Sequence, residues 1–175
     1  TEFEGPVYLR LNGAVSMPIV GQDGTEFEIG KARVLSKGRD VTFVANGSMV
    51  ARCVKAAELL AEEGIDVGVA NFHTFKPLDS EALLQIARTT SLIVTAEEHS
   101  TIGGLGSAVA EVLAEQTDSP RLLRIGVPDA FPKVGNYGWV LTQCGFDPED
   151  VATRVLGVSR KNRLVSSPLM SMERS

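Results

Sequence analysis

The segment from Val41 to Gly64, VTFVANGSMVARCVKAAELLAEEG, decides the fold of this 175-residue chain. Its first five residues are mostly β-branched or apolar, which predicts a short buried strand. Ser48 follows as a candidate N-cap, and the residues from Met49 to Glu63 carry apolar side chains at helical spacing. Gly64 is a glycine at the position where helices commonly end. The segment therefore predicts a strand followed directly by an amphipathic helix.

The alternation of strand and helix continues toward the C-terminus. Apolar runs predict three further strands, at 67–70, 91–96 and 122–125. Capping residues and helical spacing predict further helices that begin at Asp79 or Ser80, at the glycine-rich turn 103–106, and at Asp147, the last ending near Leu156. Strands that alternate with helices form parallel sheets covered on both faces. We therefore expect an α/β fold, a Rossmann-like three-layer sandwich with a mainly parallel sheet.

The pattern divides the chain into four parts. Residues 38–158 hold the regular alternation, residues 13–37 predict a linker with a hairpin around Gly24, and residues 159–175 predict a solvated basic tail. The run VYLRL at 7–11 predicts a strand, yet no element precedes it that could pair with its backbone. We therefore expect residues 1–12 to end a preceding domain, in a chain that is a fragment or a subunit of a larger protein.

Charge and composition exclude several classes of protein. The chain has 17 basic and 22 acidic residues, a net charge of −5, which does not suit a dedicated nucleic-acid binder. It has no run of about 18 apolar residues, so we expect no membrane span. Cys53 and Cys144 lie far apart without metal-ligand spacing, which indicates two buried thiols in a cytoplasmic protein.

The two histidines, His73 and His99, each follow a predicted strand. Glu97 and Glu98 adjoin His99, but neighbouring residues at the end of a strand point in opposite directions, so we expect no metal site. We expect His73 to be a core or strand-end residue. His99 lies where ligands bind in open α/β sheets, although a structural or interface role is the expected one.

Three features could bind an anion. The turn Gly103–Gly106 lies between a strand and a helix, but the GxGxxG fingerprint fails because Val109 stands at the third glycine position. Arg10 stands in an apolar run, where it is either an exposed edge residue or a bidentate cation aimed at a phosphate or carboxylate. A nucleotide site at Gly103–Gly106 or at Gly47–Ser48 remains an alternative.

Several stretches together resemble the C-terminal part of transketolase-like enzymes, most closely the C-terminal half of a split bacterial or archaeal transketolase. They are GPVYLRLNG, VTFVANGSMVARCVKAAELLAEEGI, VGVANFHTFKPLD, LIVTAEEHSTIGGLGSAVAEVLAE, and RIGVPDAFPKVG with FDPEDVATRVLG. The resemblance implies that residues 1–12 end a pyrimidine-binding domain, 13–37 form the linker, and 38–158 form the transketolase C-terminal-like α/β domain. Thiamine diphosphate and Mg²⁺ would be bound by domains outside this chain.

For the site, the resemblance implies that Arg10 binds the phosphate of the substrate, and that the chain supplies no catalytic residue and no metal ligand. Glu98, His99, Gly103 and Gly104 would shape an interdomain or dimer interface. The complete enzyme would move a two-carbon ketol unit between sugar phosphates, and the isolated chain would be inactive. Its partners would be the pyrimidine- and pyrophosphate-binding domains or subunit, within a homodimer, with no nucleic acid and no membrane.

Two alternatives remain open at this point. The chain also resembles, less closely, the C-terminal domains of 1-deoxyxylulose-5-phosphate synthase and of the 2-oxoacid dehydrogenase beta subunit. The other alternative is a non-catalytic assembly or nucleotide-binding module. The residues do not indicate which sugar phosphates would react.

Overall fold

A single sheet forms the centre of the computed structural model, which describes residues 3–11, 20 and 27–166. Within these residues the sheet has five strands in the order β1-β3-β2-β4-β5. They are β1 Arg33–Ser36, β2 Val41–Ala45, β3 Val67–Asn71, β4 Leu92–Ser100 and β5 Arg121–Val127. The pairs β2–β3, β2–β4 and β4–β5 are parallel, and only the edge strand β1 pairs antiparallel, with β3. The predicted, mainly parallel sheet is confirmed.

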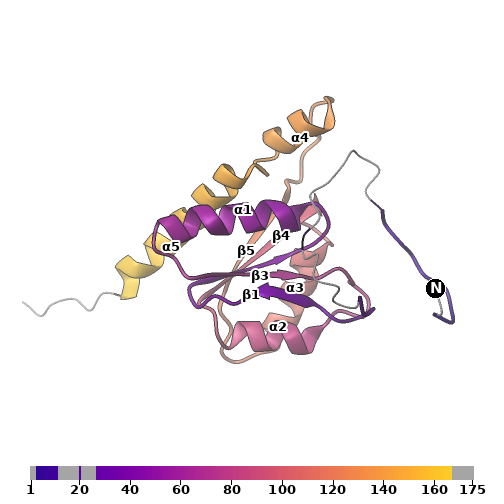
Figure 1. Ribbon diagram of the computed structural model, residues 1–175, viewed down its shortest axis with the longest axis horizontal. Helices are drawn as coiled ribbons and strands as arrows, with labels where there is room; N and C mark the ends of the chain where they lie inside the picture. The colour runs from indigo at the N-terminus through magenta and orange to yellow at the C-terminus, as the bar shows by residue number, and fades with distance from the viewer. Residues whose placement is uncertain (1–2, 12–19, 21–26, 167–175) are drawn as a thin grey trace, which may run out of the picture.

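Helices cover both faces of the sheet (Figure 1). The described helices are α1 Met49–Glu62, α2 Ser80–Ala87, α3 Leu105–Ala114, α4 Tyr137–Gln143 and α5 Pro148–Ser166. α1 and α5 lie side by side on one face, while α2 and α3 lie against the other. The predicted three-layer sandwich is therefore confirmed. None of the described helices is long and apolar enough to cross a bilayer.

The core consists of two apolar clusters, one on each face of the sheet. On the α1 face Phe43 of β2 is buried in one cluster with Leu60 of α1, and on the other face Val44 shares a cluster with Leu83 of α2. Every residue of β2 is buried because helices cover both of its faces. Full burial of such side chains contributes about 1.5–3 kcal/mol each. The apolar spacing within residues 41–64 is therefore what attaches α1 to the sheet.

The helix ends follow the sequence in part. Asp79 caps α2 as predicted, because its Oδ1 accepts from the amide of Ala82 at 3.1 Å. Its Oδ2 also accepts from the amide of Ala32 at 2.8 Å, which ties the segment before β1 to the start of α2. Ser48 precedes α1 as predicted, but its hydroxyl makes no capping hydrogen bond. Gly64 follows α1 with a φ of 75°, a conformation that favours glycine.

Several elements differ from the predictions in extent. β1 lies inside the segment expected as linker, and its side chains alternate between half-buried and exposed, which is a weak signal for an edge strand. β4 continues to Ser100, so Glu97–His99 belong to the strand rather than following it. α5 continues to Ser166 and includes the first residues of the expected tail. α4 was not predicted, because seven residues are too few to establish a helical period.

The run at 7–11 forms no strand in the structure. Residues 3–11 are all exposed and lie outside the layered domain (Figure 1), where no described strand pairs with them. The strand prediction is therefore wrong for residues 7–11 in this structure. Extended backbone is assigned to a sheet only when a neighbouring strand takes its hydrogen bonds. The predicted hairpin around Gly24 lies outside the described residues.

Gly38 provides a test of the close approach between the start of β2 and β3. A Cβ at residue 38 would lie 2.0 Å from the amide nitrogen of Gly68, so the Gly38→Ala substitution must push the two backbones apart. We expect it to lower the free energy of unfolding by about 2 kcal/mol or more. The control is Gly157→Ala in α5, where a Cβ meets nothing within 4 Å and a gain of about 0.5–1 kcal/mol is expected. Urea unfolding followed by circular dichroism measures the stability of both variants. Equal unfolding midpoints for Gly38→Ala and Gly157→Ala would contradict the close packing at Gly38.

Candidate functional site

The carboxyl ends of the parallel strands meet at one edge of the sheet. The chain passes from β2 to β3 on one side of β2 and returns to β4 on the other, so the strand order reverses between β2 and β4. Ligands of open α/β sheets bind at such a reversal, beyond the carboxyl ends of the strands. Glu97, Glu98 and His99 lie at this end of β4, and Arg10 reaches the same edge from the N-terminal segment.

Glu97 is the buried charged residue of this edge, with a relative exposure of 1%. Its Oε2 accepts from the amide of Leu105 and its Oε1 from the amide of Gly106, each at 2.7 Å. The first amides of a helix have no partner within the helix, and the positive end of the helix dipole attracts a negative group. Gly104 leaves room for this carboxylate, because a Cβ there would lie 2.1 Å from Oε2. Glu97 therefore joins the end of β4 to the start of α3.

This arrangement does not fit a nucleotide phosphate at Gly103–Gly106. An anion would bind there through free amides at the start of α3, and Glu97 already accepts hydrogen bonds from two of them. At the other candidate loop, Gly47–Ser48, the amides of Met49 and Val50 bond to the carbonyl oxygens of Asn46 and Gly47. Neither loop adds an observation in favour of a nucleotide.

Arg10 and Glu98, both predicted site residues, come together at the edge. The Nη2 of Arg10 donates to the main-chain carbonyl of Glu98 at 3.2 Å, although 88 positions separate them in the sequence. The carboxylate of Glu98 accepts from the hydroxyl of Tyr137, at the start of α4, at 2.5 Å. Among the residues that the structure describes, no carboxylate forms an ion pair with Arg10. The guanidinium is exposed and keeps N–H donors for a further partner.

The remaining predicted residues have local contacts. His99 is exposed, and its Nδ1 lies 3.0 Å from the carbonyl oxygen of Ser100. Gly103, with a φ of 78°, forms the turn that enters α3 next to Gly104. These contacts lie within the chain, and the interface role of His99, Gly103 and Gly104 stays a prediction.

His73 follows β3 as predicted and is half-buried. Its ring packs against Phe27, with 4.2 Å between the ring centroids, and its Nδ1 lies 3.0 Å from the hydroxyl of Thr74. Burial lowers the pKa of His73, because the charged imidazolium loses hydration there.

Two residues of the site were missed from the sequence. Glu97 was considered only as a neighbour of His99, yet an acidic residue at the end of a buried strand, shortly before a glycine-rich helix start, is a usable signal for such a cap. Tyr137 gave no such signal, because its contact with Glu98 depends on where α4 lies relative to the end of β4. Its ring packs against the apolar cluster on the α1 face.

The residues of this chain do not fit a thiamine diphosphate and Mg²⁺ site at this edge. No group of His, Cys, Asp and Glu in the described residues could hold a metal ion. Both carboxylate oxygens of Glu97 accept from the start of α3, and Oε1 of Glu98 accepts from the hydroxyl of Tyr137. No step of a reaction is therefore assigned to such a group on this chain.

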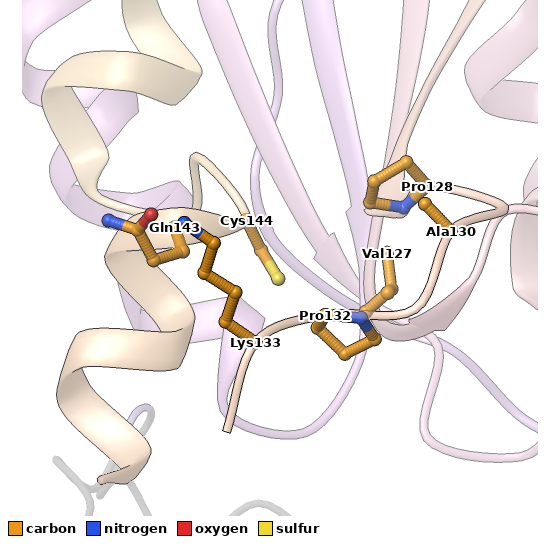
Figure 2. A pocket seen from close by; sticks show the side chains of 7 residues that line it. All are labelled: Val127, Pro128, Ala130, Pro132, Lys133, Gln143 and Cys144. Atoms are coloured by element: carbon orange, nitrogen blue, oxygen red, sulfur yellow. The ribbon is translucent and has the colours of Figure 1, made fainter. Parts of the chain in front are cut away.

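A hollow of about 170 Å³ lies between α4 and the loop after β5 (Figure 2). Its lining is mostly apolar and consists of Val127, Pro128, Ala130, Pro132, Lys133, Gln143 and Cys144. Cys144 is a free, half-buried thiol, and Cys53 is a free, buried thiol whose pKa is raised by burial. The predicted burial is confirmed for Cys53, whereas Cys144 is only half-buried. The hollow means that α4 packs only partly against the loop after β5.

A family model described as the C-terminal domain of transketolase matches residues 30–151, from just before β1 into the first turn of α5. The chain belongs to the transketolase C-terminal domain family. The match includes β4 with Glu97 and Glu98, α3, and α4 with Tyr137, whereas Arg10 precedes it.

Curated relatives and a solved structure agree with this assignment. A 6-deoxy-6-sulfo-D-fructose transketolase subunit from Clostridium sp. (strain MSTE9) is 44% identical over 91% of this chain and 49% of its own length. A 1-deoxy-D-xylulose-5-phosphate synthase from Desulforudis audaxviator is 43% identical over 95% of this chain and 27% of its own length. A split-gene transketolase, described as an inactive β4 tetramer, matches with a TM-score of 0.76 at 42% identity over 82% of this chain and 47% of that chain. This chain thus spans about half, or less, of the length of these proteins.

Glu97 can be tested by its effect on stability. The Glu97→Ala substitution leaves two buried amides at the start of α3 without an acceptor, and we expect the free energy of unfolding to fall by about 3 kcal/mol. Glu97→Gln should cost less, because the side-chain carbonyl can still accept one of the two bonds. The control is Glu111→Ala on the exposed side of α3, expected to change stability by less than about 0.5 kcal/mol. Urea unfolding compares the three, and a Glu97→Ala variant as stable as the control contradicts this account.

Proposed function

We propose that this chain is the C-terminal section of a thiamine-diphosphate-dependent transketolase. The observation that supports this most is the likeness to the split-gene transketolase chain, at 42% identity and a TM-score of 0.76. The complete enzyme transfers a two-carbon ketol unit from a ketose phosphate to an aldose phosphate. This section supplies a binding group for the substrate and a packing surface, and performs no bond-making step.

The binding group is Arg10. Its guanidinium is exposed at the carboxyl edge of the sheet, makes one hydrogen bond to a main-chain oxygen, and has no ion-pair partner among the described residues. A planar guanidinium suits a phosphate or a sulfonate, since each offers oxygens that accept parallel N–H bonds. The sulfo-sugar name of one relative supports an anionic substrate end in general. We therefore assign Arg10 to the terminal anionic group of the sugar.

Thiamine diphosphate and Mg²⁺ bind to the pyrimidine- and pyrophosphate-binding domains, outside this chain. We assign residues 1–12 to the end of the pyrimidine-binding domain, and the exposure of apolar residues such as Tyr8 and Leu9 supports this assignment. His99, Gly103 and Gly104 lie toward the interface with that domain. The complete enzyme is a homodimer of such units, the commonest symmetry for soluble oligomers.

A second candidate is the C-terminal domain of a 1-deoxyxylulose-5-phosphate synthase, favoured by the 43% identity to one such enzyme. The two candidates differ in the donor substrate. A transketolase takes the two-carbon unit from a ketose phosphate and releases an aldose phosphate, whereas a synthase takes it from a 2-oxo acid and releases carbon dioxide. Carbon dioxide release from a 2-oxo acid by the complete enzyme, without turnover of ketose phosphates, favours the second candidate.

The isolated chain tests whether the cofactor is bound by other domains of the enzyme and not by this chain. We expect the purified 175-residue chain to have no transketolase activity, because no group of His, Cys, Asp and Glu described in it could hold the Mg²⁺ that accompanies thiamine diphosphate. Activity should appear when the cofactor-binding domains are supplied, either as a separate subunit or in one polypeptide. The assay follows ketose-phosphate consumption with thiamine diphosphate and Mg²⁺ present. Unaided activity of the chain would falsify the proposal.

Arg10 is tested in the complete enzyme by the substitution Arg10→Met. Loss of a charge-assisted contact to the phosphate should raise KM for phosphorylated sugars about 10- to 100-fold. KM for a short aldehyde acceptor without phosphate should not change. Arg39→Met is the matched control. Arg39 is exposed just before β2, at the end of the sheet opposite to the carboxyl edge where Arg10 lies, and it pairs with Asp66. If the two substitutions change KM for phosphorylated sugars equally, Arg10 does not bind the anionic group of the substrate.

A further inference from the structure

The guanidinium of Arg10 binds to the main chain of a residue that itself carries a carboxylate. Its Nη2 donates to the carbonyl oxygen of Glu98, so the carboxylate of Glu98 belongs to the very residue that Arg10 touches. A glutamate side chain is long enough to turn back toward a group at its own carbonyl. Carboxylate and phosphate bind the same fork of N–H donors, so an ion pair with Glu98 would compete with an anionic substrate.

The carboxylate of Glu98 is engaged elsewhere. Its Oε1 accepts from the hydroxyl of Tyr137 at 2.5 Å, and both side chains are half-buried. Val94 and Ala96, which precede Glu98 in β4, belong to the apolar cluster on the α1 face. Tyr137 packs against that same cluster. The carboxylate is thus held on the α1 face.

Tyr137 is presented by the start of α4. Asn136 caps this helix by accepting from the amide of Trp139 at 3.0 Å, and Leu141 is buried. Between α4 and the loop after β5 lies the hollow of about 170 Å³ that Figure 2 shows, so apolar packing is incomplete on that side. The hydroxyl bond to Glu98 is therefore a specific connection between α4 and the sheet, and it is directed at one carboxylate.

We propose that Tyr137 is a positioning residue, which holds the carboxylate of Glu98 away from Arg10 and so keeps the guanidinium available for the anionic group of the substrate. This inference rests on the proposed function of Arg10. Glu98 then has two separate roles. Its main-chain carbonyl orients the guanidinium of Arg10, and its carboxylate is held where it does not neutralise that guanidinium. Removing the hydroxyl of Tyr137 releases the carboxylate, which then forms the competing ion pair.

The test is a double-mutant cycle in the complete enzyme, with Tyr137→Phe, Glu98→Gln and the two combined. Tyr137→Phe keeps the ring and its packing, and should raise KM for phosphorylated sugars about two- to fivefold with kcat unchanged. The inhibition constant of inorganic phosphate should rise by the same factor, while KM for a phosphate-free aldehyde acceptor should not change. The combined variant should return both constants to near the wild-type values, because glutamine cannot form the ion pair.

Each other outcome overturns the proposal. If the combined variant keeps the raised KM, Tyr137 acts through the packing of α4 and not through the carboxylate. An unchanged KM in Tyr137→Phe, or a raised KM in Glu98→Gln alone, contradicts the competition. Circular dichroism of each variant checks that the fold is retained. A failure of the proposed function is recognised separately, because then Arg10→Met leaves KM for phosphorylated sugars unchanged.

Discussion

The carboxylate of Glu97 bonds to two amides at the start of α3 and occupies the space that a side chain at residue 104 would need. β4 is paired on both sides, with β2 and β5, so its position is fixed by the sheet. The contact with Glu97 then fixes α3 relative to that strand and sets the path of the turn between them. A buried carboxylate is stable only while its hydrogen bonds are kept, so the end of β4 and the start of α3 are held as one unit. The backbone of Glu98, the next residue, is therefore held in place as well.

The edge of the sheet holds two groups that attract anions, and they differ in what they already bind. The start of α3 is neutralised from within by Glu97. The guanidinium of Arg10 touches a main-chain oxygen and, among the described residues, has no carboxylate partner. We therefore expect an incoming anion to bind at Arg10 rather than at the start of α3. This division is consistent with the role that we propose for the domain, in which Arg10 binds the anionic end of the substrate.

The sequence predicts those parts of the fold that local patterns encode. The apolar run at 41–45 and the helical spacing after Ser48 define β2 and α1, because buried parallel strands and amphipathic helices have strong periods. β1 and α4 were not predicted, since an edge strand of four residues and a helix of seven carry weak periods. In the site, Arg10 and Glu98 were named in advance, but their meeting across 88 positions is a tertiary contact that no local pattern contains. The same holds for the bond between Glu98 and Tyr137.

The central claim is that Glu97 occupies the start of α3 and leaves Arg10 as the group that receives an anion. A crystal structure of the complete enzyme with a bound sugar phosphate tests it most directly. The account predicts phosphate oxygens within hydrogen-bond distance of the Arg10 guanidinium, with Glu97 still bonded to the amides of Leu105 and Gly106. A phosphate bound to those amides, with the carboxylate of Glu97 displaced, would contradict it.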